Sequence, residues 1–281
     1  MTMNHSALEN LERRTCLIVG NGPSCNECEM QRIPANSFVV RTNNFFFESN
    51  YNFGKIVHLL QIGGDRWIFP YYAKTLSAML IKNVYKVNSW STHQPHIAKK
   101  GKKIIKSQHV PFAGNNHEIG AEVEKLSKKY RKQPTAGIYA ILNAHALGAS
   151  EIILAGFDLY TKPQRYSFTM RGYSKKRAMA NNGPGYNEMF HSRELDLEII
   201  QYLNQLKKLK LYRCSNSVDQ LNFLSLSPIR KNYLQPQQKT HKLNDWETYS
   251  GPFHISLAFA GSHLNQLSKR IIKNLKVIIA E

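Results

Sequence analysis

Short apolar runs alternate along the chain with longer stretches in which apolar residues recur every three or four positions. The short runs predict buried strands at residues 15–19, 37–41, 55–62, 84–90, 152–155 and 209–214. The longer stretches predict helices at residues 67–83, from about 118, at 135–147 and at 192–210. Strands and helices that alternate in this way favour a mostly parallel sheet with helices on both faces. We therefore expect an α/β, Rossmann-like fold.

Two of the predicted helices carry clear end signals. Thr135 can cap the helix at 135–147, and Gly148 ends it. Ser192 can cap the helix at 192–210, which begins with acidic residues and closes with lysines, as the helix dipole favours.

The chain of 281 residues can hold one large domain or one domain with a small appendage. We expect a polar tail at 1–14, a main domain at 15–228 with a lid at about 160–190, and a basic C-terminal region at 229–281. Within that last region, basic and apolar residues mix at helical spacing over 267–279. This pattern fits a helix lying on anionic lipid or a helix docked on its own domain.

The first two strands end in polar residues. Gly20, Asn21, Gly22 and Ser24 follow the first strand, and such glycines let a backbone approach a phosphate or ribose. The run matches neither the dinucleotide fingerprint nor the P-loop, so a tight turn is the alternative. Asn43 follows the second strand, where an amide can read a sugar hydroxyl or a base edge.

The strand at 152–155 delivers a third polar group. It ends in Gly156, Phe157, Asp158 and Tyr160, with Tyr166 in the loop beyond. Ligands of open α/β sheets bind at such carboxyl ends. Asp158 belongs to no Asp-x-Asp pair of the kind that metal-dependent sugar transferases need, which argues for phosphate neutralisation by tyrosines and basic side chains.

His191 precedes the cap of the helix at 192–210 and follows the expected lid. As a neutral imidazole, it could take a proton from a hydroxyl. A lone histidine is more often structural than catalytic, but the position of His191 after the lid and beside an acidic helix start favours function.

The charge of +19 indicates a surface that attracts phosphate, nucleic acid or anionic lipid. The four cysteines are too few for a disulfide scaffold, and Cys25 and Cys28 lack the further ligands of a zinc site, so we expect free thiols. Because no signal peptide and no membrane-spanning run is visible, we expect a cytoplasmic protein, and peripheral attachment to the cytoplasmic face of the inner membrane is compatible with this expectation.

These residues, in this order, resemble the bacterial sialyltransferases of glycosyltransferase family 42, which decorate lipooligosaccharide. The resemblance extends from about residue 15 to 228. It rests on residues 20–24, 41–48, 135–139, 146–148 and 156–160, on Tyr166, on His191 with Ser192 and Asp196, and on residues 211–212 and 216–217.

The resemblance implies a GT-A-like domain that transfers sialic acid from CMP-sialic acid with inversion, without a metal or another cofactor. It implies a galactose-terminated acceptor, an α-2,3 linkage and a homo-oligomer such as a tetramer. His191 would be the general base, and Tyr160 and Tyr166 would hydrogen-bond the departing phosphate. The implied donor-binding residues are Asn21, Gly22, Ser24, Asn43, Thr135, Ala136, Gly156, Phe157 and Asp158.

The chain departs from the family pattern on the acceptor side. Gln133 stands where an arginine is common, with Arg131 just upstream, and Ala136 replaces a serine. The third strand does not align cleanly, and Gln61 is its candidate for acceptor choice. We add Arg165 of the lid, so the acceptor-side candidates are Gln61, Arg131, Gln133 and Arg165.

Two alternative functions stay open at this point. A nucleic-acid-binding α/β protein would explain the charge and the aromatic residues, although the basic residues are dispersed and no recognition motif is visible. A transferase that uses another nucleotide sugar would also fit the strand ends.

Overall fold

The computed structural model describes residues 15–64, 66–115, 118–172, 175, 190–243 and 245–246, with scattered helical positions from 257 to 272. The expected tail at 1–14 and much of the expected lid, at 173–174 and 176–189, lie outside these residues.

Eight strands form one sheet in the order β6-β5-β4-β2-β1-β7-β8-β9, and every neighbouring pair is parallel. They are β1 (Cys16–Val19), β2 (Phe38–Thr42), β4 (Ile56–Gln61), β5 (Lys86–Ser91), β6 (Gln108–His109), β7 (Glu151–Ala155), β8 (Lys210–Arg213) and β9 (Ser225–Leu226). The predicted α/β fold is confirmed. The sequence pattern misses β6 and β9, because two-residue edge strands are too short to show a period.

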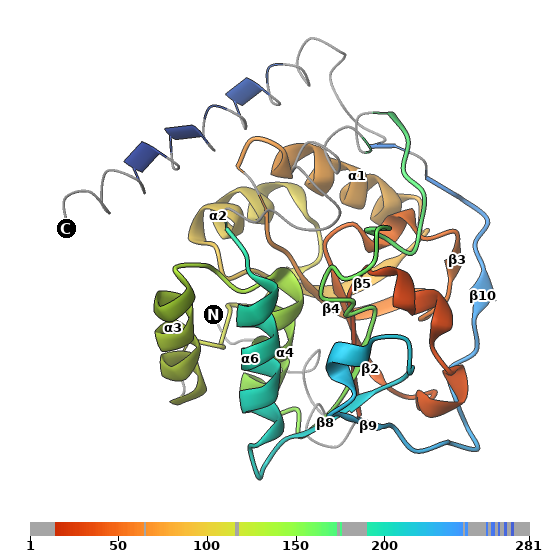
Figure 1. Ribbon diagram of the computed structural model, residues 1–281. Helices are drawn as coiled ribbons and strands as arrows, with labels where there is room; N and C mark the ends of the chain where they lie inside the picture. The colour runs from red at the N-terminus through yellow and green to blue at the C-terminus, as the bar shows by residue number, and fades with distance from the viewer. Residues whose placement is uncertain are drawn as a thin grey trace.

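The described α-helices are α1 (Phe69–Ile81), α2 (Pro95–Ile104), α3 (Glu118–Tyr130), α4 (Ala136–Ala146) and α6 (Arg193–Asn204). Figure 1 shows α3, α4 and α6 grouped together, and α1 and α2 grouped apart from them. The prediction at 192–210 was too long, because the chain turns after Asn204 to enter β8. The sequence pattern did not predict α2.

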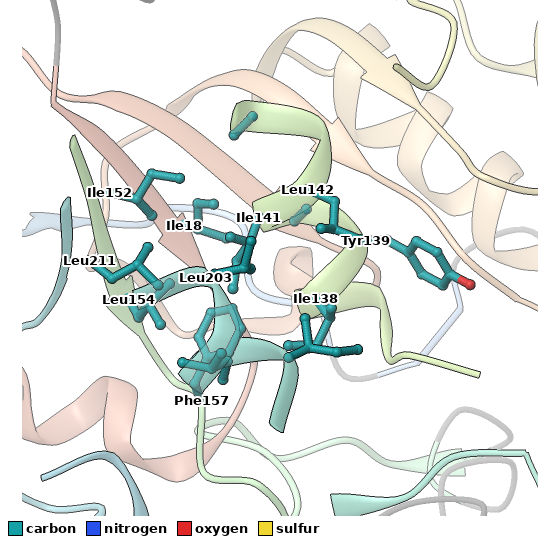
Figure 2. Close-up of a cluster of buried hydrophobic side chains, with 14 of the residues drawn as sticks. Ile18, Ile138, Tyr139, Ile141, Leu142, Ile152, Leu154, Phe157, Leu203 and Leu211 are labelled. Carbon is teal, nitrogen blue, oxygen red and sulfur yellow. The ribbon is translucent and has the colours of Figure 1, made fainter. Parts of the chain in front are cut away.

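The central strand β1 is buried on both faces, as strands of parallel sheets are. Cys16 and Ile18 join the cluster formed with α3, α4 and α6, whereas Leu17 and Val19 join a smaller cluster on the other face. Figure 2 shows the first cluster, where Ile138 and Ile141 of α4 pack toward the sheet. This packing fixes the start of α4 above the ends of the strands.

The described residues from 229 to 246 pack with the main domain. Strand β10 (Gln237–Gln238) pairs antiparallel with β3 (Asn50–Tyr51), and Trp246 belongs to the buried cluster around α1. The predicted boundary at 228 is therefore wrong for the described residues up to Trp246. The change in composition beyond Pro228 misled the prediction.

A buried lysine anchors this segment. The Lys239 ammonium donates to the carbonyl oxygens of Phe46, at 2.6 Å, and Glu48, at 2.9 Å. Beside it, Arg41 forms a buried ion pair with the Glu48 carboxylate at 2.8 Å. Burial lowers the pKa of Lys239 to about 8. The contacts join the connection after β2 to residues almost at the end of the described core.

Among the described residues, no helix is long and apolar enough to cross a bilayer.

Candidate active site

Five neighbouring strands bring polar residues to one edge of the sheet. Because these strands are parallel, their carboxyl ends meet there, and open α/β sheets bind ligands at that edge. The residues that follow the strands are Asn21 after β1, Asn43 after β2, Gly63 after β4, His93 after β5 and Asp158 after β7.

The loops after β1 and β7 pack directly against each other. The Gly20 amide donates to the Ala155 carbonyl at 2.8 Å, and the Gly22 amide donates to the Gly156 carbonyl at 3.1 Å. A Cβ atom on Gly22 would lie 2.8 Å from the Gly156 oxygen, and Gly156 has a φ of +69°. The glycines are thus needed for contact between the two loops, in addition to any approach of a phosphate or ribose.

Asp158 and Ser24 bind each other beneath these loops. The Ser24 hydroxyl donates to one Asp158 oxygen at 2.7 Å, and the Ser24 amide donates to the other at 3.1 Å. Burial raises the pKa of Asp158, and the hydrogen bonds from Ser24 oppose this change. Phe157 is buried against Gly137 at the first turn of α4. Ser24, Phe157 and Asp158 therefore hold the site together, and their contact with a donor stays a prediction.

The two asparagines link adjacent strand ends. The Asn21 side-chain amide donates to the Thr42 carbonyl at 2.8 Å, and within the described part of the chain its buried Oδ1 has no hydrogen-bond partner. Asn43 has a φ of +39°, and its Oδ1 accepts from the Gly63 amide at 2.9 Å. Asn21 therefore presents an unused acceptor where the expected nucleotide would lie.

Tyr160 stands on an unusual stretch of backbone. Leu159 and Tyr160 have φ values of +47° and +56°, in the left-handed region that most residues avoid. The Arg193 guanidinium donates to the Leu159 carbonyl at 2.9 Å and to the Tyr160 carbonyl at 3.2 Å. Strained backbone of this kind is often found at functional sites. Arg193, which the sequence analysis did not identify, thus holds the backbone at Leu159 and Tyr160 in this conformation.

Tyr166 lies at the start of the expected lid. Its ring stacks on Phe168 with centroids 5.2 Å apart and planes 10° apart. The neighbouring Ser167 amide donates to the Asn21 carbonyl at 2.9 Å, which ties this segment to the loop after β1. The described start of the lid is thus anchored to the site.

His191 is oriented by the loop that precedes α4. Its Nδ1 lies 2.8 Å from the Gln133 carbonyl oxygen, and the Gln133 amide donates to the Phe190 carbonyl at 2.7 Å. Since a carbonyl can only accept, Nδ1 carries the proton and Nε2 keeps its lone pair. Burial lowers the pKa of His191, so the neutral ring is favoured.

Asp196 of α6 holds the start of α4. It accepts from the Thr135 amide at 3.1 Å and from the Thr135 hydroxyl at 2.5 Å. The expected capping bond from Thr135 is therefore absent among the described contacts of α4, because its hydroxyl is used by Asp196. The expected cap at Ser192 is confirmed, with the hydroxyl accepting from the Leu195 amide at 3.2 Å.

We expect the substitution Asp196→Asn to change how stability depends on pH. Burial raises the pKa of Asp196 to about 7, against 3.8 ordinarily. This group therefore contributes its full stability below pH 3.8 and loses it as the pH rises through 7, on the order of 4 kcal/mol in all. Asparagine cannot ionise, so the unfolding midpoint of the variant should fall less than that of the wild type between pH 5 and 8.

Thermal unfolding at both pH values measures this effect. The matched control is Glu198→Gln on the same helix, because Glu198 pairs with Lys129 at the surface. Parallel pH curves for the wild type and Asp196→Asn would contradict the expected linkage.

The acceptor-side candidates lie in different environments. Gln61 is fully buried and accepts from the Asn143 amide at 3.2 Å, so in this structure it lies beneath the site and cannot meet an acceptor directly. Gln133 is exposed, and its Oε1 accepts from the Tyr139 hydroxyl at 3.0 Å. Arg131 is exposed and Arg165 half-buried, and their acceptor roles stay predictions.

The described residues contain no group of three or more His, Cys, Asp or Glu side chains placed to hold a metal ion. Metal independence therefore stays a prediction to be tested.

One family model matches most of the chain. It describes the alpha-2,3-sialyltransferase (CST-I) family and matches residues 14–249. A search of curated proteins found no match.

Solved structures share the fold. The monofunctional alpha-2,3-sialyltransferase Cst-I from Campylobacter jejuni is 23% identical, with a TM-score of 0.73, and the match covers 93% of this chain and 96% of that one. CstII from Campylobacter jejuni with CMP-3FNeuAc is 24% identical, with a TM-score of 0.72 and coverage of 89% and 99%. CST-II with a trisaccharide acceptor and CMP is 24% identical, with a TM-score of 0.69 and coverage of 85% and 96%.

Proposed function

This chain belongs to the alpha-2,3-sialyltransferase (CST-I) family, and we propose that it transfers sialic acid from CMP-sialic acid to a terminal galactose of lipooligosaccharide. The transfer would invert the anomeric carbon and need no metal ion. The observation that carries the proposal is the orientation of His191, whose Nδ1 lies 2.8 Å from the Gln133 carbonyl oxygen, so that the neutral ring keeps the lone pair of Nε2 for a proton.

His191 is the general base in this proposal. Nε2 takes the proton of the acceptor hydroxyl as its oxygen attacks the anomeric carbon, and the bond from that carbon to the CMP phosphate breaks. Because the pKa of His191 is lowered by burial, the ring stays neutral and ready to act near pH 7.

Tyr160 and Tyr166 stabilise the departing phosphate. The anomeric carbon of sialic acid is tertiary, so its transfer develops positive charge on the sugar while CMP leaves as an anion. Phenol donors aimed at that phosphate bind it more strongly in the transition state than in the substrate. Arg193 fixes the backbone of Tyr160, and the bond from Ser167 to Asn21 fixes the segment of Tyr166.

The donor lies along the ends of β1, β2 and β7. The unpaired Oδ1 of Asn21 can accept from a hydroxyl or an amino group of the nucleoside. Gly22, Asn43 and Gly156 supply backbone and amide groups beside it. At the start of α4, Thr135 and Ala136 would face the sialic acid carboxylate, because the positive end of a helix favours an anion there. CMP and CMP-3FNeuAc are bound by solved relatives of this fold, which supports this placement.

We place the acceptor on the side of Arg131, Gln133 and Arg165. A solved relative binds a trisaccharide acceptor, and the matching family is one of alpha-2,3-sialyltransferases. The basic side chains would suit an acceptor with phosphorylated core sugars. A homo-oligomer stays a prediction of the family resemblance.

The C-terminal segment would hold the enzyme at the cytoplasmic face of the inner membrane. Its described helical positions include the exposed residues Leu264, Leu267, Ile271 and Ile272, whose spacing gathers them on one side of a helix. The lysines and arginine expected to flank them lie outside the described residues. Apolar residues and a basic chain together favour anionic lipid.

Flotation with anionic vesicles tests this attachment. We expect that a chain ending after Trp246 loses vesicle binding but keeps its fold. The end must follow Trp246 and not Pro228, because β10, Lys239 and Trp246 belong to the core. Unchanged flotation of the shortened chain would remove the proposal.

Calorimetric titration in EDTA tests the donor class. We expect CMP to bind in the low micromolar to millimolar range typical of substrates, and an RNA oligomer to bind only weakly at 150 mM salt. Absence of CMP binding in EDTA with binding restored by Mg²⁺ would refute metal independence. Absence of binding under both conditions, or preference for another nucleotide, would refute the donor.

A further inference from the structure

His93 follows β5 and faces the start of α4 across the turn after β4. A Cβ atom on Gly63 would lie 3.5 Å from His93 Cε1 and 3.8 Å from the Ala136 Cβ, so the histidine and the helix start lie close to each other. The Gln94 side chain accepts from the Gly64 amide at 3.0 Å and fixes this turn. The proposed base, His191, lies near enough to lower the pKa of His93.

The His93 ring is packed face to face with Tyr139 of α4. Their centroids are 3.5 Å apart and their planes differ by 11°. Phe112 meets both rings edge-on, with centroids 6.2 Å from His93 and 5.7 Å from Tyr139. Aromatic pairs of this kind restrict each other's rotation, so His93 and Phe112 together determine where the Tyr139 hydroxyl points.

Gln133 connects the Tyr139 hydroxyl to His191, the proposed base. It donates to the Gln133 side chain at 3.0 Å, and the Gln133 carbonyl is the group that accepts from His191 Nδ1 at 2.8 Å. We propose that His93 is a positioning residue for His191, acting through Tyr139 and Gln133. This inference rests on the proposed role of His191 as the base.

The local charges are consistent with this role. Burial, together with the nearby His191 and His96, lowers the pKa of His93 to about 3. Burial raises the pKa of Tyr139 to about 12, and Lys132 lies near His191. His93 is thus neutral at any working pH, and it stacks without placing a positive charge beside the base. Among the described residues, its buried Nδ1 has no hydrogen-bond partner, so the ring contributes through its faces.

The glutamine makes this support necessary. Gln133 supplies the backbone carbonyl that accepts from His191 Nδ1. Its side chain is exposed, and Tyr139 is the partner that the structure gives to its Oε1. Without the stack on His93, the tyrosine could turn away and leave the segment that orients His191 less constrained.

Three single variants and one double variant test the inference. His93→Ala removes the stack and should lower kcat about 10- to 100-fold, because a misplacement of a catalytic group by about 1 Å can cost about 10²-fold, while the donor KM stays within about 2-fold. His93→Phe keeps an aromatic face and should retain nearly all activity. Tyr139→Phe keeps the stack but loses the bond to Gln133, so it should match His93→Ala, and the double variant His93→Ala/Tyr139→Phe should be little worse than either.

The pH profile supplies a readout that a general loss of stability would not move. In His93→Ala, a loosened and better hydrated His191 should regain a pKa nearer to 6.5, so the acid limb of kcat/KM should move to higher pH. The inference is overturned if His93→Ala keeps the wild-type kcat and acid limb, or if His93→Phe is as impaired as His93→Ala. Wild-type turnover by His191→Ala would instead refute the base itself, which separates the two failures.

Discussion

The substitution His191→Ala should lower kcat about 10²- to 10⁴-fold, the usual contribution of a positioned general base. CMP should still bind with nearly the wild-type affinity, because the donor-side loops after β1 and β7 do not use His191 for their contacts. Steady-state rates with CMP-sialic acid and a lactose-type acceptor, together with calorimetric titration of CMP, measure both quantities.

His145 provides a matched control for this experiment. Its Nδ1 also lies against a backbone carbonyl, that of Ala149 at 3.0 Å, but at the opposite end of α4 from the site. His145→Ala should therefore keep turnover. Full turnover by His191→Ala would show that another group accepts the proton.

The double substitution Tyr160→Phe/Tyr166→Phe should slow transfer by about 10²- to 10⁴-fold. The loss of one donor to a developing anion costs about 10²- to 10³-fold in other enzymes, and the two phenols would act on one phosphate, so the losses need not multiply. Phenylalanine keeps both rings, including the stack of residue 166 on Phe168. The defect should therefore appear in kcat, and KM for the donor should change little.

Tyr130→Phe is the control, because the Tyr130 hydroxyl donates to Glu198 on α6 at 2.6 Å, outside the site. A donor with a better leaving group gives an independent check, since it should recover part of the rate. If the double variant raised only KM, the tyrosines would bind the ground state, and the proposed leaving-group role would be wrong.

The strand ends that form the site were predictable because β1, β2 and β7 are buried on both faces. Such strands appear in sequence as continuous apolar runs, and a glycine or an asparagine marks where each one ends. Helix α2 was not predictable in this way. Its buried face is narrow and consists of Ile97 and Gly101, with Gly101 fitted against the Trp90 ring, and a glycine in that face is not recognised as an apolar position in the sequence.

The partners of the candidate residues could not be read from the sequence. Asp158 was expected at the donor, and the structure pairs it with Ser24, which is distant in the chain. Thr135 was expected to cap its own helix, and the fold turns its hydroxyl to Asp196. Each of these pairs depends on the packing of separate elements, which local periodicity does not encode.

The anchor at Lys239 bears on how the protein is made. Its partners, the carbonyls of Phe46 and Glu48, leave the ribosome first, and Lys239 follows Glu48 by 191 residues. At about 5–20 residues per second, that interval is on the order of 10–40 seconds. During this interval, Lys239 is not yet present beside the Arg41–Glu48 pair, and β3 has no antiparallel partner because β10 has not been made. The nascent chain would then expose the open edge of β3, where a chaperone acting during translation could bind.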